Sequence, residues 1–176
     1  MIVIRQRKPN RLKNFNYSSS GYYFITICTK DRQKYFGNII NDKMILNQYG
    51  NITKQCWNDI SKHFKNIELD EFQIMPNHVH GIIIIEYTNQ SVGNAYMRSL
   101  QTNHWQYRTK MLLPKIIHEF KSATSRFIRK HNSSFQWQKS FYDHIIRNEY
   151  SLFRIRQYIR DNPINWNEDR NNSDYR

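Results

Sequence analysis

The stretch that decides the fold is MPNHVHGIIIIEY, Met75–Tyr87, because it contains a turn and the most apolar run of the chain. Its Pro76-Asn77 pair is typical of turns, and the isoleucines that follow are typical of a buried strand. The preceding segment LDEFQIMP, Leu69–Pro76, alternates polar and apolar residues. We therefore predict a β-hairpin whose second strand covers residues 78–87.

Two further strands are predicted outside this hairpin. The segment GYYFITICT, Gly21–Thr29, is rich in aromatic and β-branched residues, which is the composition of a central strand. The segment FQWQKSFYDHII, Phe135–Ile146, is aromatic and alternates in part, so it predicts another strand.

Three helices are predicted from the spacing of apolar residues. In residues 47–64 an apolar residue recurs every four positions, and in residues 113–128 the apolar residues form one stripe opposite a basic face. One face of that second helix can pack while the other contacts phosphate. A last helix at residues 149–161 begins after Asn148, a favourable N-cap, and ends before Pro163.

The order of these elements, β-α-β-β-α-β-α, predicts an α+β fold, a ferredoxin-like antiparallel sheet with helices packed on it. The chain has 176 residues, about the length of one domain. We assign residues 21–166 to that domain. We expect a basic arm at residues 1–20, a long polar loop at 88–110 of the kind that usually carries function, and a polar, frayed tail at 167–176.

The charge of the chain points to a polyanionic partner. There are 27 Lys and Arg residues against 14 Asp and Glu residues, a formal net charge of +13. Such a surplus is typical of nucleic-acid binding, although a merely basic protein or one attracted to anionic membrane has the same charge. Tyr, Trp and Phe interleaved with Arg and Lys suit stacking on unpaired bases, which favours single-stranded nucleic acid over a membrane surface.

The cysteines and the apolar runs suggest an intracellular setting. Cys28 and Cys56 are far apart and lie in apolar segments, which indicates buried reduced thiols rather than a disulfide or a thiolate zinc site. The apolar part of the N-terminal MIVIRQRK is too short for a signal peptide, and no run approaches the roughly 18 apolar residues of a membrane span. We therefore expect a cytoplasmic protein.

His78 and His80 are two residues apart in the predicted strand, so their side chains project from the same face. Two imidazoles this close resist being charged together, and a shared divalent cation removes that conflict. The ordinary alternative is a pair of partly buried histidines bonded to backbone or carboxylate groups. Spacing alone leaves both interpretations open.

A metal bound by this pair needs a third ligand from elsewhere in the chain. Spacing does not choose among the candidates, which are the other histidines, a carboxylate and an amide: His63, His104, His118, His131, His144, Glu71 and Asn162. Asn162 lies one helical turn after Tyr158, on a helix flank that could face the sheet. A tyrosine beside a metal-bound phosphate would be a nucleophile, but from the residues alone Tyr142 and Tyr150 are almost equal candidates.

Three motifs, in order along the chain, resemble those of the REP-associated tyrosine transposases, single-tyrosine nucleases of the His-hydrophobic-His (HUH) superfamily. They are MPNHVHGI at Met75–Ile82, FYDHIIRN at Phe141–Asn148 and YIRDNPINW at Tyr158–Trp166. The resemblance extends over about residues 22–166 and includes GYYFITICTKDR, LNQYGNI and LPKIIHEFKS. Each motif is weak alone, but their combined order and spacing are specific.

The resemblance implies an enzyme that cuts and rejoins single-stranded DNA through a 5′-phosphotyrosine intermediate, often beside a hairpin. It implies that His78 and His80 are metal ligands, that Tyr158 on the last helix is the nucleophile, and that Asn162 completes the metal site. Because Asn162 precedes a proline, we expect its backbone to leave helical geometry and its side chain to be able to turn elsewhere. The metal would be Mg²⁺ or Mn²⁺, and two histidine ligands make manganese at least as suitable.

Other basic and polar groups are candidates for holding the DNA strand. They are Arg126, Arg129 and Lys130 on the second helix, Arg147 after the last strand, and the basic arm with Arg11 and Lys13. His144 is a candidate for DNA contact, for supporting a metal ligand, or for a purely structural role.

Two other functions fit part of the sequence. An inactive relative would bind structured single-stranded nucleic acid without cutting it, and the loss of a histidine or of the tyrosine would indicate this, but none is lost. A histidine-ligated zinc hydrolase of small substrates would explain His78 and His80 but neither the charge nor the tyrosine helix. The sequence does not decide between a monomer and a homodimer.

Overall fold

The computed structural model describes residues 12, 15–87, 111–172 and 174. Arg11 and Lys13, most of the predicted arm, and the predicted loop at 88–110 with His104 lie outside the described residues. Within the described part of the chain, no helix has both the length and the apolar character needed to cross a membrane.

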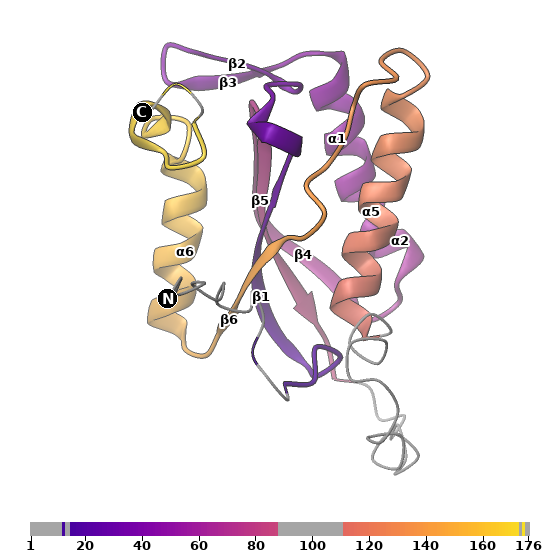
Figure 1. The fold of residues 1–176 in the computed structure, drawn as a ribbon. Coiled ribbons are helices and arrows are strands. Elements are labelled where there is room, and N and C mark those ends of the chain that lie inside the picture. The colour runs from indigo at the N-terminus through magenta and orange to yellow at the C-terminus, as the bar shows by residue number, and fades with distance from the viewer. Residues whose placement is uncertain (1–11, 13–14, 88–110, 173, 175–176) are drawn as a thin grey trace, which may run out of the picture.

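A four-stranded antiparallel sheet forms the middle layer, in the order β4-β5-β1-β6 (Figure 1). Its strands are β1 (Gly21–Cys28), β4 (Ile67–Met75), β5 (His78–Ile85) and β6 (Tyr142–Ile146). β4 and β5 are the predicted hairpin, and β1, the predicted central strand, pairs with β5 on one side and β6 on the other. This strand order is ferredoxin-like, so the predicted α+β fold is confirmed.

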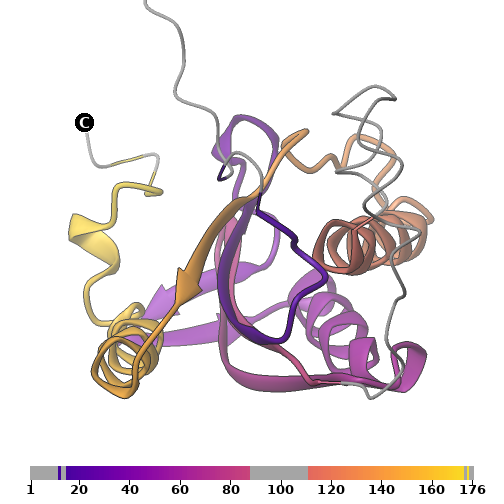
Figure 2. The same ribbon diagram turned by 90° about the horizontal axis from the view of Figure 1, so that it is seen from below.

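Helices cover both faces of the sheet (Figure 2). α1 (Gln48–Asn58), α2 (Ile60–His63) and α5 (Leu112–Ile128) lie on one face, and α6 (Glu149–Asp161) lies on the other. Because side chains alternate along a strand, β5 sends Ile83 into the core under α1 and α5 and Ile82 into the smaller core under α6. The single helix predicted at 47–64 is two helices, α1 and α2, whereas α5 and α6 match their predicted ranges closely.

Asparagine N-caps start the first and the last helix. The Asn47 Oδ1 accepts a hydrogen bond from the Gly50 amide at 3.0 Å, and the Asn148 Oδ1 accepts one from the Ser151 amide at 2.8 Å. Each cap satisfies an amide that the helix leaves without a partner. The start of α6, and with it the position of Tyr158 along the helix, is set as predicted.

The end of the predicted arm belongs to the fold. Tyr17 is buried in the large core, and its carbonyl accepts a hydrogen bond from the Leu113 amide at 3.1 Å. The Ser18 hydroxyl accepts another from the Leu112 amide at 2.9 Å. Residues 15–20 thus satisfy the start of α5, which is why they do not form a free arm.

Two strand predictions are corrected by the structure. A hairpin of β2 (Gly37–Ile40) and β3 (Lys43–Leu46) lies between the strand predicted at 21–29 and the helix predicted at 47–64, where no strand was predicted. Its turn residues Asn41 and Asp42 have φ values of 49° and 59°, the left-handed pair that a tight hairpin requires. The strand predicted at 135–146 is limited to Tyr142–Ile146, because Phe135 and Trp137 turn into the core instead.

The predicted frayed tail is wrong as far as residue 172. Residues 165–172, which we call the C-terminal segment, contain a 3-10 helix (Trp166–Glu168) and the buried side chains of Trp166, Asp169, Asn171 and Asn172. The Arg32 Nη1 donates to the Arg170 carbonyl at 2.9 Å and to the Asn171 Oδ1 at 2.7 Å. A polar segment can be buried when its polar groups find such partners, so distant residues order this one.

Candidate metal and tyrosine site

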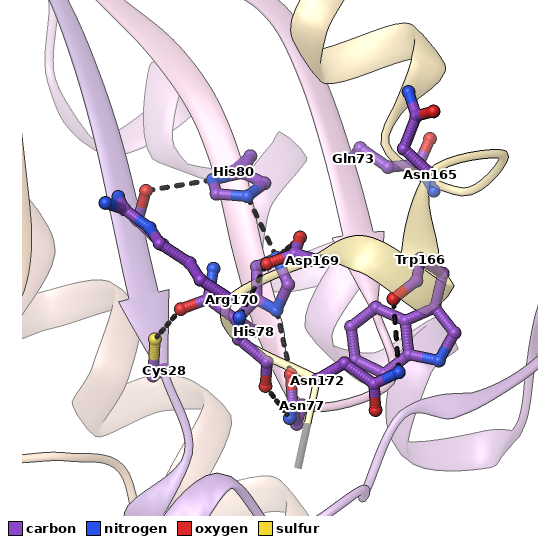
Figure 3. Close-up of polar contacts among 12 residues, drawn as sticks. Cys28, Gln73, Asn77, His78, His80, Asn165, Trp166, Asp169, Arg170 and Asn172 are labelled. Atoms are coloured by element: carbon purple, nitrogen blue, oxygen red, sulfur yellow. Dashed lines mark hydrogen bonds and ion pairs between the residues drawn. The ribbon is translucent and has the colours of Figure 1, made fainter. Parts of the chain in front are cut away.

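His78 and His80 lie side by side on β5, buried beneath α6 and the C-terminal segment (Figure 3). Their Nε2 atoms are 2.9 Å apart. The Nδ1 of His78 is 2.8 Å from the Asn77 Oδ1, and that of His80 is 2.9 Å from the Thr26 hydroxyl. Contacts at the two Nδ1 atoms therefore orient the histidines, and the two Nε2 atoms lie next to each other.

Asn77 determines the proton position on His78. The Asn77 Nδ2 donates to the Arg32 carbonyl at 3.1 Å and to the Asn171 carbonyl at 2.8 Å, which leaves its Oδ1 to accept from the His78 Nδ1. A neutral imidazole protonated at Nδ1 carries a lone pair on Nε2. Asn77 thus prepares the His78 Nε2 to act as a metal ligand.

Both histidines are neutral in the folded protein. Burial, aided by the nearby charge of Arg32, lowers the pKa of His78 to about 3. Burial and the proximity of His78 lower the pKa of His80 well below its usual value. Since the neutral imidazole is the form that binds metal, the site needs no proton loss from these residues near pH 7.

A third potential ligand, Asp169, comes from the C-terminal segment. It is buried, and its Oδ2 is 3.7 Å from the His78 Nε2. Its Oδ1 accepts from the Asn171 amide at 2.6 Å, whereas its Oδ2 has no hydrogen-bond partner among the described residues. A buried carboxylate oxygen without a partner is costly, and a cation at this point would satisfy it.

His78, His80 and Asp169 could hold a metal ion, because one ligand atom from each lies within 4.8 Å of the others. Two nitrogens bound about 2.1 Å from one ion and at right angles to each other would be about 3 Å apart, which fits the observed histidine spacing. Sequence reasoning missed Asp169 because no periodic pattern marks its segment. Its only signal is a carboxylate shortly after the Tyr158–Trp166 motif.

Asn162 lies at the same centre, at the C-terminal end of α6. Its φ and ψ are −58° and −39°, so the expectation that Pro163 forces it out of helical geometry is wrong. Its side chain is buried, and its Oδ1 has no hydrogen-bond partner within the described ranges, although the amide is close enough to influence the pKa values of His78 and Tyr158. A second oxygen is thus available beside Asp169.

The other third-ligand candidates among the described residues do not join this cluster. Glu71 pairs with Arg160 at 2.7 Å. His63 and His118 line a cavity of about 510 Å³ beside α5, on the opposite face of the sheet. His131 follows α5, and His144 lies on β6.

α6 places Tyr158 against the histidine pair. Its hydroxyl oxygen is 3.3 Å from the His80 Nε2, and its ring packs edge-on against Phe24 with centroids 6.0 Å apart. Tyr150, on the same helix, is 70% exposed, and Tyr142, on β6, packs edge-on against Phe24 with centroids 6.4 Å apart. Of these three tyrosines, Tyr158 is the one whose hydroxyl lies within hydrogen-bonding distance of a histidine.

The Tyr158 hydroxyl is protonated in the metal-free protein. Burial raises its pKa above the usual value, and the charge of Asp169 adds to this rise. Arg170 and Asn162 act in the opposite direction. Positive charge near the hydroxyl is therefore what would favour the phenolate.

The candidate DNA contacts divide between the two faces. His144 pairs with Phe24 in the sheet and is exposed on the edge strand β6, and Arg147 follows that strand. Arg126, Arg129 and Lys130 lie along and just after α5, on the face away from Tyr158. The structure does not bring these two groups together, and their contact with DNA stays a prediction.

Two relatives in sequence come from Haemophilus influenzae. No family model matches the chain. An uncharacterised protein of Haemophilus influenzae is 43% identical over 167 residues, 94% of this chain and 93% of that protein. A second Haemophilus influenzae protein, assigned as a REP-associated tyrosine transposase, is 25% identical over 151 residues, 85% of this chain and 73% of that protein. The chain is thus similar in sequence to a protein assigned as a REP-associated tyrosine transposase.

A solved structure shares the fold. It is a REP-associated tyrosine transposase bound to a REP hairpin, with a TM-score of 0.57 and 16% sequence identity. The match covers 89% of this chain and 74% of that one. Homology to a REP-associated tyrosine transposase supports a DNA-processing function of the HUH type. The described residues also contain a group, His78, His80 and Asp169, that could hold a metal ion.

Proposed function

We propose that this protein is a metal-dependent single-stranded DNA endonuclease and strand transferase that forms a 5′-phosphotyrosine intermediate at sites beside DNA hairpins. The observation that carries the proposal is the position of the Tyr158 hydroxyl, 3.3 Å from the His80 Nε2 at the edge of the cluster. The net charge of +13 and the hairpin bound to the related structure support DNA as the substrate.

The metal would be held by His78, His80 and Asp169, with Asn162 as a further oxygen donor. The Asp169 Oδ2 and the Asn162 Oδ1 are buried and have no hydrogen-bond partner among the described residues, which supports this assignment. Mixed nitrogen and oxygen donors suit Mn²⁺ at least as well as Mg²⁺. When bound, the ion would polarise the scissile phosphate and offset its developing negative charge.

Tyr158 would attack the phosphorus in line with the leaving oxygen. The new bond joins its Oη to phosphorus, and the bond from phosphorus to the 3′-oxygen breaks. The Tyr158 proton passes to water, because the residue is 42% exposed, and the leaving 3′-oxygen takes a proton from water. Since a phosphodiester replaces a phosphodiester, another 3′-hydroxyl can reverse the step without ATP.

The nucleophile is tested by trapping the covalent adduct. The full chain is incubated with single-stranded genomic fragments and Mn²⁺, and the attached DNA is sequenced after denaturing separation. We expect an adduct that needs the metal and disappears in Tyr158→Phe. Tyr150→Phe is the matched control because it removes the same atom from an exposed residue of the same helix.

Two outcomes would contradict the proposal. An adduct that persists in Tyr158→Phe would show that another residue attacks the phosphate. Tight hairpin binding with no adduct in Mn²⁺ would instead indicate a binding protein that does not cut DNA.

The metal ligands are tested by Mn²⁺ titration followed by electron paramagnetic resonance. We expect Asp169→Asn to weaken Mn²⁺ binding by about 10-fold or more, because it removes the only carboxylate in the described cluster. Asn162→Ala should weaken binding less, because it removes a neutral donor. Equal Mn²⁺ affinity in wild type and Asp169→Asn would exclude Asp169 as a ligand.

A further inference from the structure

Arg170 differs from the neighbouring cations because no hydrogen bond or ion pair with a described residue engages its guanidinium. Lys34 pairs with Asp174. The remaining three are engaged as follows: Arg32 donates to the C-terminal segment, Arg156 pairs with Asp70, and Arg160 pairs with Glu71. Arg170 is exposed, and its guanidinium makes no ion pair with any described residue.

The Arg170 side chain extends from the C-terminal segment toward β1 (Figure 3). Its guanidinium lies over the Tyr142 ring, 5.8 Å from the centroid. Tyr142 and Tyr158 both pack edge-on against Phe24, at 6.4 and 6.0 Å. The cation and Tyr158 are therefore linked through two rings, Tyr142 and Phe24, on the same face of the sheet.

Electrostatic effects agree with this placement. The charge of Arg170 acts to lower the pKa values of His78, His80 and Tyr158. Arg170 directly follows Asp169 in the chain, so its backbone adjoins the cluster. Its backbone is fixed, because the Arg170 carbonyl accepts from Arg32 at 2.9 Å.

We propose that the Arg170 guanidinium binds a phosphate of the DNA strand next to Tyr158, as the anion-binding residue of the site. This inference rests on the proposed function, since it assigns a role in that same site. A guanidinium offers parallel donors that match two phosphate oxygens, and a stacked guanidinium loses less freedom on binding. The ring of Tyr142 supplies the stacking surface.

The first test measures phosphate contact without metal or cleavage. Binding of a labelled 20-nucleotide thymidine strand to the full chain is followed by fluorescence anisotropy across salt concentrations. Arg170→Gln should make the slope of log K against log salt shallower by about 0.7, the contribution of one single-strand phosphate contact. Arg170→Lys should keep most of the slope because it keeps the charge. Arg160→Gln is the control, since that cation is already paired.

The second test locates the contact at the metal. Inorganic phosphate is titrated into the Mn²⁺-loaded protein, and ³¹P relaxation reports phosphate near the ion. Arg170→Gln should weaken phosphate binding about 10-fold, a loss of one charge-assisted contact, while Mn²⁺ affinity changes less than about twofold. Loss of Mn²⁺ binding together with phosphate would show a structural role and overturn the proposal.

The two tests separate this inference from the proposed function. If wild type binds no Mn²⁺, the metal chemistry fails, and the salt slope alone then decides the role of Arg170. An unchanged salt slope in Arg170→Gln would overturn the inference even if Tyr158 forms the adduct.

Discussion

The sheet face under α1 and α5 carries the large apolar core, whereas the face under α6 is apolar at one end and polar at the other. The first face buries Trp57 and Phe120 in a continuous core. On the second, β5 carries Ile82 into a small cluster with Leu152 and Ile159, and then His80 and His78 toward the C-terminal segment. One strand thus supplies both a packing surface and a pair of metal-binding groups.

This difference suggests that the two faces have separate tasks. The large core holds the strands in place, so β5 can present polar side chains on its other face without loss of the fold. α6 covers that face with fewer apolar contacts and gains ion pairs to β4. A register shift between Leu69 and Phe72 lets the consecutive Asp70 and Glu71 both reach α6.

The largest expected effect on stability lies on the α1 and α5 face. Trp57 is fully buried, with ring centroids 5.4 Å from Phe120 and 5.8 Å from Phe72. Trp57→Ala should lower the free energy of unfolding by about 3 to 5 kcal/mol, measured by urea denaturation. Tyr158→Phe should change it by less than about 0.5 kcal/mol while abolishing the adduct. Similar losses of stability in both variants would contradict the idea that the two sheet faces have separate tasks.

The next effect is a loss of stability in acid that comes from the α6 face. The folded-state pKa of His78 is about 3 and that of His80 is also lowered, whereas unfolded histidine titrates near about 6.5. Below that pH the unfolded chain binds more protons, so the free energy of unfolding should fall by up to about 1.4 kcal/mol per pH unit per histidine. Stability attributable to neutral histidines is complete above pH 6.5 and is lost toward pH 3.

Denaturation at pH 6.5 to 4.5 measures this slope before most carboxylates titrate. Replacement of both histidines by glutamine is the comparison, and it should flatten the slope. A slope that the double variant shares with wild type would mean that the acid sensitivity arises elsewhere.

The elements that sequence patterns predicted are those with strong local signals. The isoleucine run after Pro76-Asn77 predicted β5, and Asn148 with Pro163 predicted α6. β2 and β3 were missed because strands of four residues are too short to show alternation.

Only part of the site was predicted from the sequence. Strand spacing placed the two histidines on one face, and the family resemblance pointed to Tyr158. Asp169 and Arg170 were missed because their order depends on Arg32, which is 138 residues from Arg170 in sequence. A hydrogen bond over that separation leaves no periodic pattern in a polar segment.

The smallest effect expected concerns how α6 is held over the site. The Arg156 Nε donates to Oδ1 and Oδ2 of Asp70 at 3.2 Å and 3.0 Å, and the Arg156 Nη2 donates to Oδ2 at 2.7 Å. The side chains of Arg156 and Asp70 are 37% and 15% exposed. Because the pair is partly exposed, Asp70→Asn should lower the free energy of unfolding by only about 1 kcal/mol. Glu119→Gln is the control, since its 3.9 Å pair with Lys115 is well exposed and should contribute less than about 0.5 kcal/mol. If Asp70→Asn costs no more than the control, the Arg156–Asp70 pair does not help to hold α6. A reduced adduct yield at unchanged stability would instead show that the ion pair sets the distance between Tyr158 and the histidines.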